Sequence, residues 1–284
     1  MTEYEKQLQR IKYAVMSDGA KIGYEELGSG DKYVFCSMMD HAETTYVRKF
    51  ADYGYHVILV WNRSCGPSAE GNRDKDFEND WYNRWADDVC EIADSLGVKK
   101  FIYTGASHGA GTGWHILWRH QERVSAFIAL VCGPHPLNGE TSCLRDKLAQ
   151  NPDFDPFNYE SDDPEVLKRR AAHMEYHDEI QQYMSSFNYR RPMVSLGSEE
   201  ALIELLKTFK TPTLMLCGLE DAIIEPKYNL RTAQALPNCK LVFYSQSGHS
   251  FLHHEAVEET MEESLNFLRN LEENNGRIYK KLEK

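Results

Sequence analysis

The residue whose setting most directly suggests chemistry is Ser107, in the run Gly105-Ala106-Ser107-His108-Gly109. β-formers precede this run, and apolar residues at helical spacing follow it from Trp114. Glycines on both sides remove the Cβ atoms that would collide where a strand turns sharply into a helix. The pattern therefore predicts a strand, a tight turn and a helix, with Ser107 in strained backbone geometry at the helix N-terminus. Unpaired N–H groups there favour developing negative charge, so the hydroxyl is a candidate nucleophile.

The same pattern also fits a structural turn or a dinucleotide site, so the serine needs partners. A serine nucleophile requires a base within hydrogen-bond reach and a carboxylate that holds the base. In a parallel sheet such groups gather at the carboxyl ends of strands. One strand-like run ends at Gly218-Leu219-Glu220-Asp221, and a later one is followed by Gly248-His249. Nucleophile, acid and base thus occur in that order, each just after a predicted strand.

The elements that must position these groups alternate between strands and helices. A hairpin is expected over Ile11–Tyr24 with its turn at Ser17-Asp18-Gly19. The chain is expected to be an α/β protein with a mostly parallel eight-stranded sheet flanked by helices. Beyond the hairpin, the expected strands are Tyr33–Cys36, His56–Trp61, the run before Gly105, Ala126–Cys132, Thr213–Cys217 and Leu241–Tyr244. Outside residues 134–209, the expected helices are Thr44–Tyr53, Trp81–Leu96, the run after Gly109, one opened by Pro226, and Val257–Leu271.

The character of the chain changes between residues 134 and 209. Pro, Asp, Tyr and Met accumulate there, helical pieces are expected near Glu165–Met184 and Glu199–Phe209, and no good strand is found. We therefore expect a core domain formed by residues 1–133 and 210–284, and a helical lid formed by residues 134–209.

The charge, the cysteine content and the lack of long apolar runs limit the partners and the compartment that can be expected for this chain. The chain has 284 residues and a formal net charge of −12, so binding to nucleic acid is disfavoured. Seven cysteines without a Cys-x-x-Cys spacing indicate reduced thiols and a cytoplasmic setting. Neither a signal segment nor an apolar run long enough to span a bilayer is found, so no membrane association is expected. A monomer and a homodimer both remain open.

Taken together, these motifs resemble those of the α/β-hydrolase fold superfamily over nearly the whole chain. The matching motifs are Gly105–Gly109, the acid loop Gly218–Pro226, Gly248-His249, and Arg63-Ser64-Cys65-Gly66-Pro67-Ser68, where Ser64 stands in place of the usual glycine. The resemblance implies that Ser107 is the nucleophile, His249 the base and Asp221 the orienting acid, with Glu220 as its rival.

The segment after the third strand departs from the family pattern. The family usually has His-Gly there, whereas this chain reads Cys36-Ser37-Met38-Met39-Asp40-His41-Ala42, without glycine. The resemblance implies an oxyanion hole formed by two backbone N–H groups. One is expected from His108, and the other from Met38 or Met39.

The expected activity is hydrolysis of a carboxylic ester or lactone-type substrate through an acyl-enzyme on Ser107. Cleavage of a C–C bond beside a ketone and acyl transfer remain alternatives, and so does a ligand-binding receptor that retains the three residues but turns over slowly or not at all. A serine at the turn argues against the family's epoxide hydrolases and haloalkane dehalogenases, which use aspartate there.

The substrate is expected to be a small, partly apolar molecule. Asp40 and His41, after the third strand, and Tyr176 and Tyr183, in the expected lid, are candidate substrate contacts. His173 and His177 have a spacing that suits a metal but lack a third ligand pattern, so no metal is expected. No cofactor is expected either, because the glycines after Ser107 lack the acidic residue of a nucleotide site.

Overall fold

The fold is described from a computed structural model. It describes residues 6, 8–38, 45–63, 65–68, 81–131, 133–138, 150–151, 164, 192–245, 247–249 and 257–279. Eight strands form one sheet in the order β1-β2-β4-β3-β5-β6-β7-β8. The chain divides into two compact units, the first comprising Met1–Ser125 with Ala171–Ser195, and the second Ala126–Arg170 with Leu196–Lys284.

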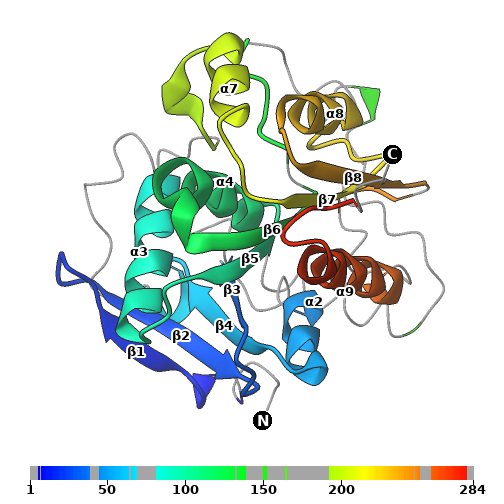
Figure 1. The fold of residues 1–284 in the computed structure, drawn as a ribbon. Helices are drawn as coiled ribbons and strands as arrows, with labels where there is room; N and C mark the ends of the chain where they lie inside the picture. Colours follow the sequence, from blue (N-terminus) through cyan, green and yellow to red (C-terminus); the bar gives the residue numbers. More distant parts are fainter. Residues whose placement is uncertain are drawn as a thin grey trace. The chain divides into compact units, whose positions relative to one another are not determined.

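The strands of the first unit follow the predicted pattern (Figure 1). The expected hairpin is present, with β1 antiparallel to β2, and β2 is also antiparallel to β4. β3 is parallel to both β4 and β5, so the predicted, mostly parallel arrangement is confirmed. Their bounds are Lys12–Val15 for β1, Lys21–Leu27 for β2, Tyr33–Met38 for β3, His56–Trp61 for β4 and Phe101–Ala106 for β5.

Two of these strands show how the sequence pattern produces the core. The continuous apolar run of β4 is buried from Val57 to Trp61, as expected for a strand covered on both faces. β3 extends two residues beyond the expected end at Cys36, because Ser37 and Met38 continue the pairing with β4 and are also buried.

The main helices of the first unit, α3 and α4, lie side by side (Figure 1). Apolar residues at helical spacing on α3 form its buried face, with Trp81, Trp85, Val89 and Ile92 inside the unit. The helical segments of this unit are α2 Thr45–Arg48, η2 Lys49–Tyr53, η3 Gly66–Ser68, α3 Trp81–Ser95, α4 His108–His120 and η5 Gln121–Arg123.

The second unit contains the remaining parallel strands. β7 is parallel to both β6 and β8, and the pairing runs to Gly218 opposite Tyr244. α9 turns an apolar face inward, which includes Met261, Phe267 and Leu268. The elements are β6 Val124–Leu130, η6 Val194–Leu196 at the junction with the first unit, α7 Glu199–Leu206, β7 Thr213–Gly218, α8 Pro226–Ala235, β8 Cys239–Tyr244 and α9 Val257–Glu273.

Most of the expected lid, residues 134–209, lies outside the described residues. Within the part that is described, α7 coincides with the helix expected near Glu199–Phe209. The side chain of Ser198 caps this helix by accepting a hydrogen bond from the Ala201 N–H at 3.2 Å. Glu199 at its start pairs with Arg231 of α8. The lid as a separate domain stays a prediction.

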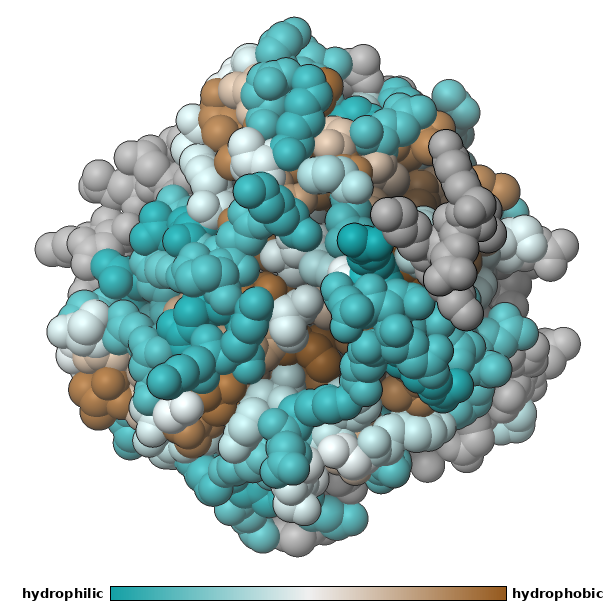
Figure 2. Space-filling view, viewed as in Figure 1, coloured by the Kyte–Doolittle hydropathy of each residue, from teal (hydrophilic) through white to brown (hydrophobic). Residues whose placement is uncertain are grey.

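The surface seen in Figure 2 is mostly hydrophilic, with apolar side chains scattered over it. This agrees with a chain in which 27% of residues are charged. No helix of the described part of the chain is both long and apolar enough to cross a bilayer. Among the described cysteines, Cys36, Cys65, Cys90 and Cys217 are buried thiols and Cys239 is half-buried.

Candidate active site

Ser107 lies in the first unit, at the turn between β5 and α4. β5 ends at Ala106 and α4 begins at His108, so the predicted strand, turn and helix are present. Ser107 has φ 48° and ψ −109°, a strained conformation for a residue with a side chain. Its carbonyl accepts the Gly111 N–H at 2.9 Å, which begins the helix. The serine is half-buried at the helix N-terminus, where a nucleophile is expected.

Glycines permit this turn because the backbone approaches itself closely. A Cβ on Gly105 would lie 2.5 Å from the carbonyl carbon of Gly109, and a Cβ on Gly109 would lie 2.8 Å from the carbonyl oxygen of Ser37. Gly111 faces a different neighbour, since a Cβ there would lie 2.6 Å from the ring of Tyr82 on α3. These three glycines therefore serve close packing, and of the three only Gly109 packs against a strand, β3.

Aromatic side chains of α3 and α4 contact one another and the residue that follows the serine. His108, the residue after Ser107, shares a hydrogen bond of 2.7 Å between its Nδ1 and the Tyr82 hydroxyl. The ring of Tyr82 also stacks on His115. Neither Tyr82 nor His115 was among the expected site residues, because nothing local in the sequence connects them to Ser107.

His115 connects α4 to the chain at residues 192–195. Its Nε2 accepts the Met193 N–H at 2.8 Å, and its Nδ1 lies 2.8 Å from Asn83 Oδ1. An acceptor at Nε2 requires the proton on Nδ1, so His115 is neutral and donates to Asn83. Burial lowers the pKa of His115 to about 3.

The carboxylate and the imidazole lie together in the second unit. Asp221 Oδ2 accepts a hydrogen bond from His249 Nδ1 at 2.8 Å, and both side chains are buried. Asp221 Oδ1 accepts the N–H groups of Ile223 and Ile224 at 2.8 and 2.9 Å. The rival acid, Glu220, is exposed. Of the two acidic residues, Asp221 is therefore the one whose side chain is hydrogen-bonded to His249.

The two loops that carry this pair meet through their backbones. A Cβ on Gly218 would lie 2.2 Å from the Ser247 carbonyl oxygen, so only glycine fits at the end of β7. The Glu220 N–H donates to the same oxygen at 2.9 Å, and the Leu219 N–H donates to Tyr244 O at 2.9 Å. These contacts hold the acid loop against the loop of His249.

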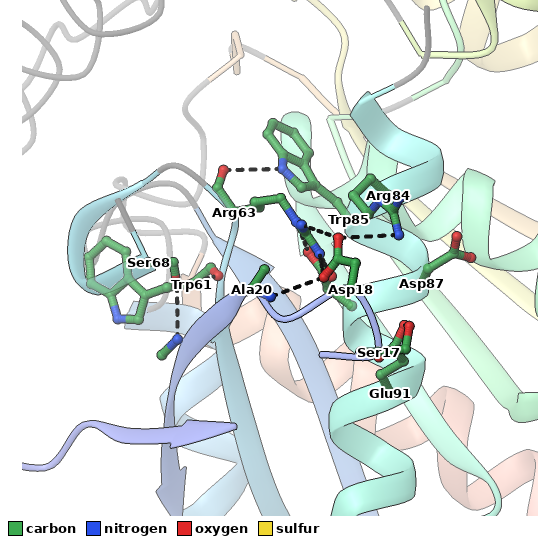
Figure 3. A network of polar contacts seen from close by, with 12 residues as sticks. Ser17, Asp18, Ala20, Trp61, Arg63, Ser68, Arg84, Trp85, Asp87 and Glu91 are labelled. Carbon is green, nitrogen blue, oxygen red and sulfur yellow. Dashed lines mark hydrogen bonds and ion pairs between the residues drawn. The ribbon is translucent and has the colours of Figure 1, made fainter. Parts of the chain in front are cut away.

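Arg63 and Ser68, at the two ends of the Arg63–Ser68 motif, make polar contacts with the hairpin (Figure 3). Arg63 contacts Asp18 in the hairpin turn at 2.6 Å and Asp88 of α3 at 2.5 Å. Burial raises the pKa of Asp88 to about 6 against the opposing effect of Arg63. Burial also opposes ionisation of Asp18, but its hydrogen bonds to Arg63 hold its pKa below the usual value. Ser68 Oγ donates to Trp61 O at 3.0 Å. This loop supports the fold.

The register of β3 bears on the expected oxyanion donors. Met38 pairs with Trp61, and its carbonyl accepts the Asn62 N–H at 2.8 Å. In a parallel pair the N–H and C=O of one residue point to the same neighbouring strand. The N–H of Met38 therefore points toward β4 rather than toward Ser107, which argues against Met38 as a donor.

Several expected site residues lie outside the described residues, namely Met39, Asp40, His41, Tyr176 and Tyr183, together with the weighed histidines His173 and His177. Within the described ranges, no group of three or more His, Cys, Asp or Glu side chains is placed to hold a metal ion. The structure thus brings Asp221 and His249 together in one unit, and places Ser107 with its strained turn in the other.

An eight-stranded, mostly parallel sheet with a serine at such a strand-to-helix turn defines the α/β-hydrolase class of fold. The profile of the alpha/beta hydrolase fold family matches residues 27–174, and the chain belongs to that family. The family expected from the sequence motifs is thereby confirmed.

Curated relatives of the chain include hydrolases of several kinds. A 2-hydroxy-6-oxononadienedioate/2-hydroxy-6-oxononatrienedioate hydrolase from Pseudomonas sp. is 23% identical over 72% of this chain and 74% of its own length. The bifunctional esterase/perhydrolase DCH from Acinetobacter calcoaceticus is 24% identical over 84% of this chain and 92% of its own length.

Solved structures share the fold. A putative lipase from Acinetobacter baumannii AYE has a TM-score of 0.70 at 18% identity, with 96% of this chain and 98% of that chain covered. The meta-cleavage product hydrolase CumD from Pseudomonas fluorescens IP01 has a TM-score of 0.66 at 19% identity, with 92% and 98% covered. At such identities the likeness establishes the fold alone.

Proposed function

We propose that this chain is a serine hydrolase that cleaves a carboxylic ester or lactone-type substrate through an acyl-enzyme on Ser107. The observation that carries the proposal is the buried hydrogen bond between Asp221 and His249, because it prepares the imidazole to act as a base. The strained turn at Ser107 supports the other half of the proposal, since it presents the hydroxyl at a helix N-terminus.

The Asp221 carboxylate dictates which ring nitrogen of His249 reacts. Asp221 Oδ2 can only accept, so the proton of neutral His249 resides on Nδ1 and Nε2 is left as the acceptor. In the proposed reaction Nε2 takes the Ser107 proton while Oγ forms a bond to the substrate carbonyl carbon. The imidazolium then returns that proton to the leaving oxygen as the C–O bond breaks.

The second half of the reaction releases the acid. His249 Nε2 removes a proton from water, and the resulting hydroxide oxygen adds to the acyl carbon. The bond to Ser107 Oγ then breaks, and the imidazolium returns the proton to Oγ. The enzyme is regenerated without any cofactor, because every proton transfer uses the same nitrogen.

Two backbone N–H groups are proposed to stabilise the oxyanion in both halves. One is that of His108, which directly follows the nucleophile at the start of α4. The other is that of Met39 rather than Met38, because the Met38 N–H points toward β4.

A second candidate reaction is hydrolysis of a C–C bond beside a ketone. Two relatives favour it. The first relative above is a 2-hydroxy-6-oxononadienedioate/2-hydroxy-6-oxononatrienedioate hydrolase. Another, from Pseudomonas putida, is a 2-hydroxymuconate semialdehyde hydrolase that is 27% identical over 182 residues. The same nucleophile and base would serve, with carbon rather than oxygen as the leaving atom.

The remaining elements of the proposal concern the substrate and its surroundings. We propose that the substrate is a small, partly apolar molecule and that residues 134–209 form a lid. Asp40, His41, Tyr176 and Tyr183 are proposed to contact the substrate. A cytoplasmic location is also proposed, and the buried thiols within β3 and β7 support a reducing compartment.

The test is rapid-mixing kinetics with p-nitrophenyl esters, lactones and a 2-hydroxy-6-oxo dienoate. A burst of nitrophenol equal to the enzyme concentration is expected, and Ser107→Ala should abolish it. Ser125→Ala is the matched control, because Ser125 is an exposed serine of β6. Faster turnover of the dienoate than of every ester would select the C–C reaction. A chain that gives no burst and is not labelled at Ser107 by an organophosphonate would instead be a binding protein.

A further inference from the structure

The hydroxyl of Tyr103 connects the strand before the proposed oxyanion loop to the helix after the nucleophile. Tyr103 lies in β5 and is completely buried. Its Oη lies 2.9 Å from Ser37 Oγ, near the end of β3, and 2.8 Å from the carbonyl oxygen of Gly109, in the first turn of α4. The Ser37 N–H donates to the same Oη at 3.3 Å. One phenol oxygen thus joins three elements of the first unit.

The direction of each hydrogen bond follows from the partners. The Gly109 carbonyl oxygen can only accept, so it receives the single hydroxyl proton of Tyr103. The Ser37 hydroxyl must then donate to Tyr103, as the Ser37 N–H does. Burial raises the pKa of the Tyr103 phenol above its ordinary value, so the proton needed for this arrangement stays in place.

The groups held by Tyr103 are near neighbours of the proposed oxyanion donors in the chain. Gly109 directly follows His108, whose N–H is the first donor, and Ser37 precedes Met39 by two residues. We propose that Tyr103 is a positioning residue that fixes the end of β3 at Ser37 relative to the first turn of α4, which carries the His108 N–H. This inference rests on the proposed function, since it concerns how the same site is held.

A second contact between the same two segments agrees with this role. Gly109 approaches β3 so closely that a Cβ on it would lie 2.8 Å from the carbonyl oxygen of Ser37. The backbones of β3 and α4 therefore touch at Gly109 and are also linked through Tyr103.

The experiment compares Tyr103→Phe with the wild-type chain in ester hydrolysis and in the rate of Ser107 labelling by an organophosphonate. Phenylalanine fills nearly the same volume but removes the hydroxyl and its hydrogen bonds to Ser37 and Gly109. Loss of a whole oxyanion donor costs about 10²- to 10³-fold in kcat, and a displaced donor retains part of its effect. We therefore expect kcat and the labelling rate to fall about 10- to 100-fold together, with KM changed by less than about twofold.

Ser68→Ala is the matched control for stability. It also removes a buried hydroxyl that links two elements, through bonds of 3.0 Å to Trp61 O and 2.9 Å from the Gly23 N–H. It should lower the unfolding temperature without changing kcat. If Tyr103→Phe does not fold, Ser37→Ala decides the matter, with an expected fall in kcat of about 2- to 10-fold at unchanged KM.

The outcomes separate this inference from the function on which it rests. An active wild-type chain whose Tyr103→Phe variant keeps kcat per labelled site within about twofold overturns the positioning role and leaves the hydrolase proposal standing. The positioning role is likewise overturned if Ser37→Ala, as the deciding variant, keeps the wild-type kcat. A wild-type chain that neither hydrolyses an ester nor is labelled at Ser107 overturns both proposals.

Discussion

Replacing Asp221 by asparagine tests the proposed base, His249, most directly, because the contacts of Asp221 determine the orientation that the asparagine amide would take. Asp221 Oδ1 accepts two backbone N–H groups, from Ile223 and Ile224, so the amide oxygen of asparagine would keep that position. The amide N–H₂ group would then face His249 Nδ1 at the site where Oδ2 now accepts a proton at 2.8 Å. A donor there forces the ring proton onto Nε2.

The expected loss of activity follows from that tautomer. An imidazole protonated at Nε2 cannot accept the proton of Ser107, and this exchange in a serine-protease triad lowers kcat by about 10⁴-fold. That fall corresponds to about 5 kcal/mol of transition-state free energy. Stability should change little, because the two backbone hydrogen bonds to Oδ1 are retained.

The assay is steady-state ester hydrolysis together with thermal unfolding of Asp221→Asn. Glu220→Gln is the control, since it makes the same chemical change at the adjacent, exposed residue. It should leave kcat within about twofold of wild type. If Asp221→Asn keeps more than about a tenth of the wild-type kcat while folded, the carboxylate does not set the tautomer of His249 and the reasoning fails.

Three further predictions concern the first unit. Gly105→Ala should abolish labelling of Ser107 and lower the unfolding temperature, because its Cβ would lie 2.5 Å from the Gly109 backbone; wild-type labelling would contradict this. Tyr82→Phe should change the pH profile of kcat by removing the hydrogen bond between the Tyr82 hydroxyl and His108 Nδ1, measured against wild type, and an identical profile would refute the link. The pKa of His115 is about 3 in the folded chain and about 6.5 when unfolded, so the unfolded chain binds more protons between these values and stability falls as pH falls below 6.5. At pH 5 the loss should be about 2 kcal/mol in urea unfolding, and His115→Gln should lose less between pH 7 and pH 5 than wild type does.

The parts of the fold that the sequence predicted correctly depend on local patterns. The strained turn at Ser107 could be predicted because each glycine requirement is met within four residues of the serine. The buried face of α3 followed from its periodicity, and the end of β7 at the acid loop followed from the change from apolar to polar residues. In each case the signal and the structure occupy the same short segment.

The parts that could not be predicted depend on contacts between distant segments. Tyr103 and Ser37 are 66 residues apart, and Tyr82 and His108 are 26 apart. The local sequence around these residues does not indicate which polar side chains will form hydrogen bonds with each other, because that depends on strand register and helix packing. The argument against Met38 as an oxyanion donor likewise required the pairing of Met38 with Trp61, which a run of apolar residues does not encode.

Each half of the candidate site combines a glycine that allows a close backbone contact with a buried polar group that makes several hydrogen bonds. This combination explains how Ser107 in the first unit and His249 in the second can be held in place. In the first unit a glycine, Gly109, admits the Ser37 carbonyl oxygen, and a buried hydroxyl bonds to both residues. In the second unit Gly218 admits the Ser247 carbonyl oxygen, and the buried carboxylate of Asp221 binds both its own loop and His249. A close contact between two backbones leaves their segments less conformational freedom than a contact through long side chains. The buried polar group then fixes their relative orientation through its hydrogen bonds. Each half is therefore organised by its own contacts, which is the condition under which preorganised groups stabilise a transition state without rearranging.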